Sequence, residues 1–97
     1  MKGFSKVVGT TFYPDNDLSK IKVGQELILI REKDNKFDSN AIAVYAELDK
    51  MCKIGHVKKE LAVEMAQAID GGDIIMAEVT DVTGGGEYNV GLNYKFW

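Results

Sequence analysis

Two lysines lie at the start of the most clearly helical segment of this chain, just after its single histidine. His56 precedes Lys58 and Lys59, and free backbone N–H groups at a helix start attract anions. The helix dipole disfavours each lysine there by about 0.3–1 kcal/mol, and Glu60 offsets only part of this cost. A local rule broken without visible compensation is typical of functional sites, which favours a phosphate ligand. The alternative is that both lysines point into solvent and serve solubility.

Aromatic residues near charged segments form the second group of candidates. Phe37 lies between Lys36 and Asp38, and a ring in such a loop can stack on a nucleic-acid base, worth roughly 1–3 kcal/mol. Phe12 and Tyr13 are adjacent, and because strand neighbours point to opposite sides, we expect one of the two rings to face solvent. Covering a barrel end or packing on a loop is the alternative role for that ring.

The charged loop contains its own turn chemistry. Arg31, Lys33 and Lys36 are balanced by acidic neighbours, so this loop alone is not a phosphate-binding funnel. Asp38 and Asn40 have a simpler alternative role, because such side chains commonly shape a turn through hydrogen bonds to the backbone.

Catalysis is disfavoured by the residues available. Acid–base or nucleophilic chemistry needs a positioned partner for His56, and Cys52 has the pattern of a packing residue. A metal site needs several ligands, whereas the chain offers one cysteine and one histidine. A metal-dependent hydrolase or nuclease would have to use Asp34 and Asp38. We therefore expect no enzymatic activity, no metal and no cofactor.

Size and charge restrict the class of protein. With 97 residues, 45% of them hydrophobic, the chain suits a single domain over 1–97. It contains no secretory signal and no run of about 20 apolar residues, which predicts a cytoplasmic protein without a membrane partner. A net charge of −3 argues against a basic surface that coats nucleic acid, so a polyanion would have to bind at a local patch.

The elements that must position these residues are mostly strands. Hydrophobic patterns predict strands over 4–10, 25–31, 42–48, 51–57, 74–82 and 88–97, with a hairpin at 49–50 and a turn at 84–86. A helical period over 59–70 ends at two glycines. Six strands and one main helix in so short a chain predict a mainly β fold, an OB-like, partly closed six-stranded barrel.

Four segments resemble the HIRAN domain in order and spacing. They are VVGTTFY at 7–13, REKDNKFDSNAIAVY at 31–45, IGHVKKELA at 54–62 and VTGGG at 82–86. The elements Phe-Asp-x-Asn-Ala-Ile and Ile-Gly-His-x-x-x-Glu-Leu-Ala are together specific for this family. The resemblance covers nearly the whole chain. The chain resembles a stand-alone bacterial or phage-type member of that family.

This resemblance implies a DNA-binding module that captures single-stranded 3′-hydroxyl ends in DNA repair or replication, with a helicase or another repair protein as a further partner. By position, Phe12 and Phe37 would offer ring faces to bases, Asp38 would lie near the terminal hydroxyl, and His56 and Lys59 would meet phosphate. The implied DNA-binding residues are Phe12, Tyr13, Phe37, Asp38, His56, Lys58 and Lys59, and Arg31, Asn40 and Gly55 are predicted to be structural loop residues.

The chain also departs from the family pattern. Thr11 occupies the position of an arginine, both aromatic positions lack a tyrosine hydroxyl, and Lys36 replaces a common proline. One phosphate contact and two hydrogen bonds of DNA-binding members therefore have no counterpart here. The alternative function is a protein-interaction or accessory module that has lost DNA binding, motivated by the acidic balance and by Tyr88, Tyr94 and Trp97 near an expected exposed edge.

Overall fold

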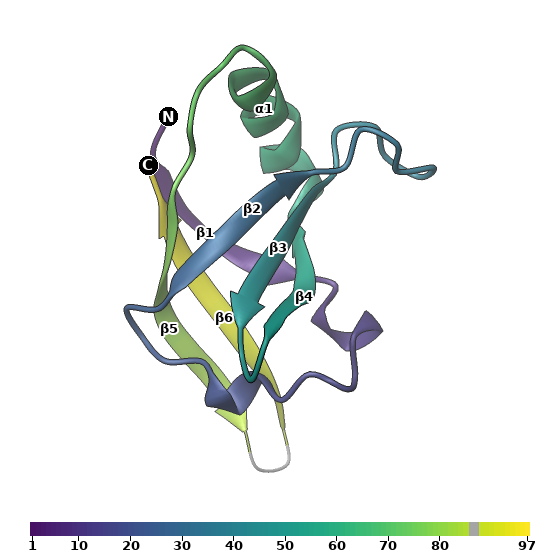
Figure 1. Cartoon of the computed structure of the whole chain (residues 1–97). Coiled ribbons are helices and arrows are strands. Elements are labelled where there is room, and N and C mark those ends of the chain that lie inside the picture. The colour runs from purple at the N-terminus through teal and green to yellow at the C-terminus, as the bar shows by residue number, and fades with distance from the viewer. Residues whose placement is uncertain (86–87) are drawn as a thin grey trace.

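Six antiparallel strands form a closed barrel in the computed structural model, which describes residues 1–85 and 88–97 (Figure 1). In chain order they are β1 (Gly3–Val8), β2 (Glu26–Arg31), β3 (Ile42–Glu47), β4 (Met51–Val57), β5 (Ala77–Gly85) and β6 (Tyr88–Phe96). The order around the barrel is β1-β4-β3-β2-β5-β6, and pairing of β6 with β1 completes the ring. The mainly β, OB-like fold is confirmed, with a ring more completely closed than predicted.

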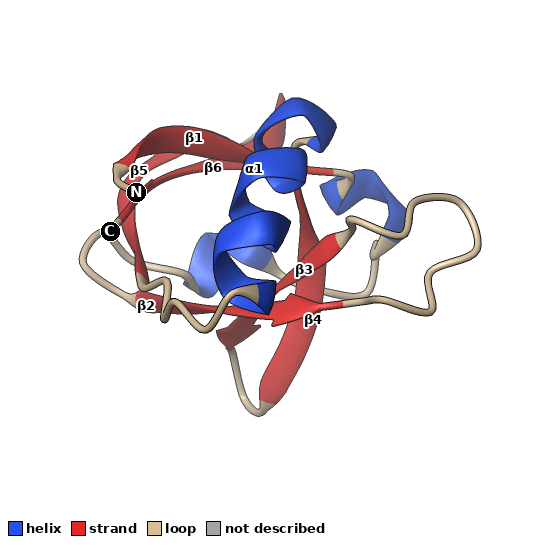
Figure 2. Ribbon diagram, turned by 90° about the horizontal axis from the view of Figure 1, so that it is seen from above, coloured by secondary structure: helices blue, strands red, loops and turns tan. Residues whose placement is uncertain are grey.

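The helix α1 (Lys59–Asp70) has the predicted bounds and lies across one end of the barrel (Figure 2). Its buried face consists of Ala62, Met65 and Ala66, and Met65 belongs to the barrel's hydrophobic core. Two short 3₁₀ helices, η1 (Thr10–Phe12) and η2 (Leu18–Lys20), lie between β1 and β2. Among the described residues, no helix is long and apolar enough to span a membrane.

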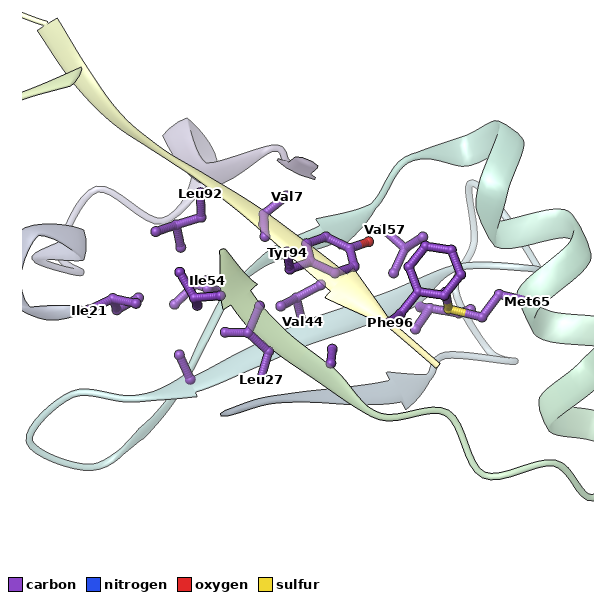
Figure 3. Close-up of a cluster of buried hydrophobic side chains, with 14 of the residues drawn as sticks. Val7, Ile21, Leu27, Val44, Ile54, Val57, Met65, Leu92, Tyr94 and Phe96 are labelled. Atoms are coloured by element: carbon purple, nitrogen blue, oxygen red, sulfur yellow. The ribbon is translucent and has the colours of Figure 1, made fainter. Parts of the chain in front are cut away.

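Alternation along β6 fills the barrel interior. Leu92, Tyr94 and Phe96 are buried, and they point into the cluster that Figure 3 shows. Burial raises the pKa of the Tyr94 hydroxyl. The expectation that Tyr94 lies near an exposed edge is therefore wrong, because β6 pairs on both sides and turns this ring inward. The side chain of Tyr88 lies outside the part of the structure that is described.

Several strand boundaries differ from those predicted, most clearly the end of β1 and both ends of β5. β1 ends at Val8 because Gly9 adopts a left-handed conformation, with φ of 72°, and turns the chain into η1. β5 begins at Ala77, and Ile74 is exposed on the connection from α1. The predicted glycine turn is only partly described, since Gly84 and Gly85 lie in β5 while residue 86 lies outside the described residues. The predicted hairpin between β3 and β4 is confirmed.

Candidate nucleic-acid interface

Two projecting segments flank β4 on one side of the barrel. They are η1 and the 32–41 loop, the connection between β2 and β3, and both extend from the same side in Figures 1 and 2. Phe12 on η1 is 82% exposed and Phe37 on the 32–41 loop is 96% exposed. An exposed ring at each of these positions agrees with the sequence-based expectation. Phe12 faces solvent because of the 3₁₀ turn rather than through strand alternation.

Gly55 allows β1 to approach β4 closely enough to position η1. A Cβ atom at Gly55 would lie 2.5 Å from the carbonyl oxygen of Val8 and 2.7 Å from Cγ1 of Val7. Without that atom, Val8 pairs with His56, and the chain turns directly afterwards. The predicted structural role of this glycine thus has a steric reason, although Gly55 belongs to a strand and not to a loop.

Arg31 attaches the 32–41 loop to the rest of the fold. Its Nε and Nη2 atoms each lie 3.0 Å from a carboxylate oxygen of Asp70 at the end of α1. Its Nη1 atom donates to the carbonyl oxygens of Ser39 and Ala41, at 3.1 and 3.0 Å. Because the guanidinium is planar and donates in fixed directions, these contacts hold both ends of the loop against α1. Lys33 is a weaker partner of Asp70, at 3.7 Å.

The tip of the 32–41 loop is ordered by its own side chains. Oδ1 of Asn35 accepts hydrogen bonds from the backbone N–H groups of Phe37 and Asp38, at 2.9 and 3.1 Å. Oδ1 of Asp38 accepts one from the Asn40 backbone at 2.9 Å. Asp38 therefore shapes the turn, as the simpler interpretation of the sequence held. A carboxylate has two oxygen atoms, and the second can still accept a hydrogen bond from a ligand.

Glu32, the first residue of the 32–41 loop, contacts His56 and Lys53 on β4, and we call these three residues the charged centre. The Oε1 atom of Glu32 lies 2.6 Å from Nε2 of His56 and accepts a hydrogen bond from Asn35 at 3.2 Å, while Oε2 pairs with Lys53. Burial opposes ionisation of Glu32, but the hydrogen bonds from Lys53, His56 and Asn35 outweigh burial and lower its pKa to about 2. Burial also opposes the charge of Lys53, yet Glu32 and Tyr13 raise the pKa of Lys53.

Lys53 connects this centre to η1. Its Nζ atom lies 5.7 Å from the centroid of the Tyr13 ring, and its carbonyl oxygen accepts a hydrogen bond from Asn16 at 2.7 Å. Tyr13 is half-buried and follows η1 directly. The candidate Tyr13 therefore contributes a packed ring beside a cation, in contrast to the projecting ring of Phe12.

Lys58 and Lys59 are exposed at the first turn of α1, which continues directly from β4. Lys58 occupies the N-cap position without a side-chain capping bond, so the broken local rule at this helix start is present in the structure. Glu60 is the acidic residue in the first turn. His56 lies two residues before the cap, so α1 begins at the same end of β4 as the charged centre.

Sequence reasoning missed Glu32, Lys53 and Asn35. No partner for His56 could be named from the sequence, and in the structure Glu32 contacts it. The pairing becomes visible only when the strand register is known, and β3 and β4 shift register between Val44 and Tyr45. Among the described residues, no group of three or more histidine, cysteine, aspartate and glutamate residues could hold a metal ion.

We call the residues Phe12, Phe37, Asp38, His56 and Lys59 together the candidate interface. The family-level comparison matches the HIRAN domain over residues 2–96. The chain belongs to the HIRAN domain family. This membership supports a nucleic-acid-binding role, and it confirms the family predicted from the sequence motifs.

Two solved structures are similar to this HIRAN domain. The crystal structure of the HIRAN domain of human HLTF has a TM-score of 0.74 and 27% sequence identity, covering 99% of this chain and 74% of that chain. The crystal structure of a protein from Lactobacillus plantarum has a TM-score of 0.68 and 23% identity, covering 99% and 98% of the two chains. At that identity it shows the fold alone. The search of curated proteins found no match.

Proposed function

We propose that this HIRAN domain binds single-stranded DNA and captures it by its 3′-hydroxyl end. The observation that carries the proposal is the placement of two exposed rings, Phe12 and Phe37, on segments that flank the charged centre on β4. Exposed rings stack on unpaired bases with little regard to sequence. A duplex keeps its bases stacked on one another and offers no free face, so the arrangement favours an unpaired strand.

His56 and Lys59 contact the backbone phosphates in this proposal. In the imidazolium form both ring nitrogens of His56 are donors, so Nε2 donates to Glu32, which orients the ring, and Nδ1 can donate to a phosphate oxygen. Lys59 is exposed at the helix start, where the backbone N–H groups also favour an anion. Since Glu32 balances part of the positive charge, few phosphates are neutralised. The logarithm of the binding constant should fall with the logarithm of salt concentration with a slope of about −1 to −2.

Asp38 provides the selectivity for the end. Its carboxylate is held by the turn and is an acceptor only, so a terminal 3′-hydroxyl can donate to it. A terminal 3′-phosphate at the same place would bring two negative groups together and be repelled. The domain therefore binds a free hydroxyl end in preference to a phosphorylated end.

The test compares three probes by fluorescence anisotropy: a single strand with a 3′-hydroxyl, the same strand with a 3′-phosphate, and a blunt duplex. We expect the hydroxyl strand to bind most tightly. Asp38→Asn keeps an oxygen that can accept the hydrogen bond from the Asn40 backbone but removes the negative charge. The variant should therefore bind the 3′-hydroxyl strand and the 3′-phosphate strand with more similar affinities. Equal binding to all three probes, or none, contradicts end capture.

The proposal includes a role in DNA repair or replication with a helicase or another repair protein as partner. A pull-down whose protein partner is retained after nuclease treatment, together with no DNA binding in the anisotropy assay, would favour the accessory-module alternative instead. That alternative has lost one of its arguments, because Tyr94 is buried.

A further inference from the structure

The outer face of β1 and β6 carries aromatic and basic side chains that the candidate interface does not use. Along β1, Lys2, Phe4 and Lys6 are exposed at every second position, just before and within the strand. Phe4 is 78% exposed and pairs across the strands with Lys95. Trp97, directly after β6, is 49% exposed.

These side chains enclose a shallow hollow of about 570 Å³. Its lining consists of Lys2, Gly3, Phe4, Lys95, Phe96 and Trp97. The Nζ atom of Lys95 lies 5.7 Å from the centroid of the Trp97 ring and 3.0 Å from Oε2 of Glu78. Glu78 thus holds this lysine beside the tryptophan. We call Lys2, Phe4, Lys6, Lys95 and Trp97 together the β1–β6 platform.

We infer that the β1–β6 platform is a second contact for single-stranded nucleic acid, which binds the nucleotides that continue from the captured end. This inference rests on the proposed function. Aromatic rings interleaved with lysines are the composition of a stacking platform, because rings accept bases while the ammonium groups follow the phosphates. Three of the five platform residues are lysines, and Glu78 pairs with one of them, while Asp81 lies on the same outer face, opposite Asn93.

The platform is continuous with the candidate interface along β1. Side chains on one face of a strand alternate, so Phe4, Lys6 and Val8 share the outer face. Val8 is paired with His56 on the neighbouring β4, and paired residues lie on the same face. A strand held at His56 therefore reaches Phe4 by following about four residues of β1, roughly 13 Å.

The test uses oligothymidylates with a free 3′-hydroxyl and lengths of about 4 and about 12 nucleotides, within the range of site sizes for OB folds. Trp97 is the single tryptophan of the chain, so its emission reports contact with the platform directly. We expect the longer strand to bind about tenfold more tightly and to quench Trp97, while the shorter strand binds without quenching.

Phe4→Ala should reduce the affinity for the longer strand nearly to the affinity for the shorter strand. The affinity for the shorter strand should not change. Val23→Ala, an exposed apolar residue between η2 and β2, is the control and should change neither affinity. The double variant Lys2→Gln, Lys6→Gln should bind the longer strand with a weaker salt dependence. The slope of the logarithm of its binding constant against the logarithm of salt concentration should be shallower by about one for each phosphate that a lysine no longer neutralises.

The outcomes separate the two proposals. If the short strand binds, but length has no effect and Trp97 emission does not change, the platform inference is overturned and end capture stands. If the Phe4→Ala variant retains the full advantage of the longer strand, the platform is also excluded. If neither strand binds, the proposed function fails and the platform inference fails with it.

Discussion

Oε1 of Glu32 lies 2.6 Å from Nε2 of His56, so the first residue of the 32–41 loop contacts the histidine near the end of β4. The same carboxylate pairs with Lys53, whose ammonium group lies beside the Tyr13 ring. One acidic side chain therefore joins the 32–41 loop, β4 and the segment that follows η1. This connection links the two segments that carry Phe12 and Phe37.

The pKa of Glu32 makes the stability of the fold pH-dependent. Its pKa falls from an ordinary value near 4.5 to about 2 in the folded chain, so the unfolded chain binds this proton more readily. The stabilisation is present above about pH 4.5 and is lost as the pH falls toward 2. Because one pKa unit corresponds to 1.36 kcal/mol, the ionised Glu32 side chain stabilises the fold by at most about 3 kcal/mol.

Glu32→Gln should therefore lower the free energy of unfolding near neutral pH and leave it almost unchanged near pH 2. Urea denaturation across this pH range measures both values. Glu64→Gln, on the exposed face of α1, removes a carboxylate without touching the charged centre and serves as the control. A Glu32→Gln variant with the same pH profile as the unaltered protein would contradict this assignment.

Arg31→Lys should loosen the 32–41 loop while preserving the charge. A lysine cannot reproduce the paired contact with Asp70 together with the bonds to the carbonyls of Ser39 and Ala41. We expect the free energy of unfolding to fall by about 1–2 kcal/mol, because the hydrogen bonds to the two carbonyl oxygens are lost. Amide hydrogen exchange in residues 32–41 should become faster. Lys33→Ala, which removes the weaker partner of Asp70, should leave exchange in the loop unchanged.

Gly55→Ala should destabilise the barrel at the approach of β1 to β4. The added methyl group would meet the Val8 carbonyl oxygen at 2.5 Å, and backbone atoms cannot move aside as a flexible side chain could. The expected cost is about 1–3 kcal/mol in thermal or urea denaturation. Met51→Ala, an exposed change in the same strand, should stay within about 0.5 kcal/mol. Equal stability of the two variants would show that β1 can shift freely.

Phe12→Ala and Phe37→Ala should each weaken binding of a 3′-hydroxyl single strand by roughly 1–3 kcal/mol, the value of one stacked base. Both rings are exposed, so the thermal midpoint should not change, and a loss of affinity can be assigned to the interface. Anisotropy titrations of each variant beside Val23→Ala measure the effect. Unchanged affinity in both phenylalanine variants would remove stacking from the proposal.

Local patterns were sufficient for the elements of this fold. The apolar alternation of β6, the helical period of α1 and the hairpin after β3 all appear where the residues predicted them. They were predictable because side-chain period and turn chemistry depend on residues close in sequence. The end of β1 was missed because the left-handed conformation of Gly9 decides it, and a glycine allows but does not demand that conformation.

The candidate interface was predictable only in part. The exposed ring of Phe37 could be inferred from its place in a charged loop, whereas the residues predicted only that one ring of the adjacent pair Phe12 and Tyr13 faces solvent. The charged centre could not, because Glu32 lies 21 residues from Lys53 and 24 from His56. The register shift between β3 and β4 pairs Lys53 with Tyr45 and His56 with Ala43, which puts both on one face of β4, and no local pattern encodes that shift.

The residue order alone was enough to establish the family, the barrel class and the polarity of the 32–41 loop, since each depends on motifs or on neighbours along the chain. The pairing of distant strands decided the rest. By pairing with both β4 and β6, β1 closed the barrel, which buried Tyr94 and set Val8 beside His56, while the register of β2, β3 and β4 brought Glu32 to its partners. Those contacts join distant segments, and their geometry exists only after the ring has formed.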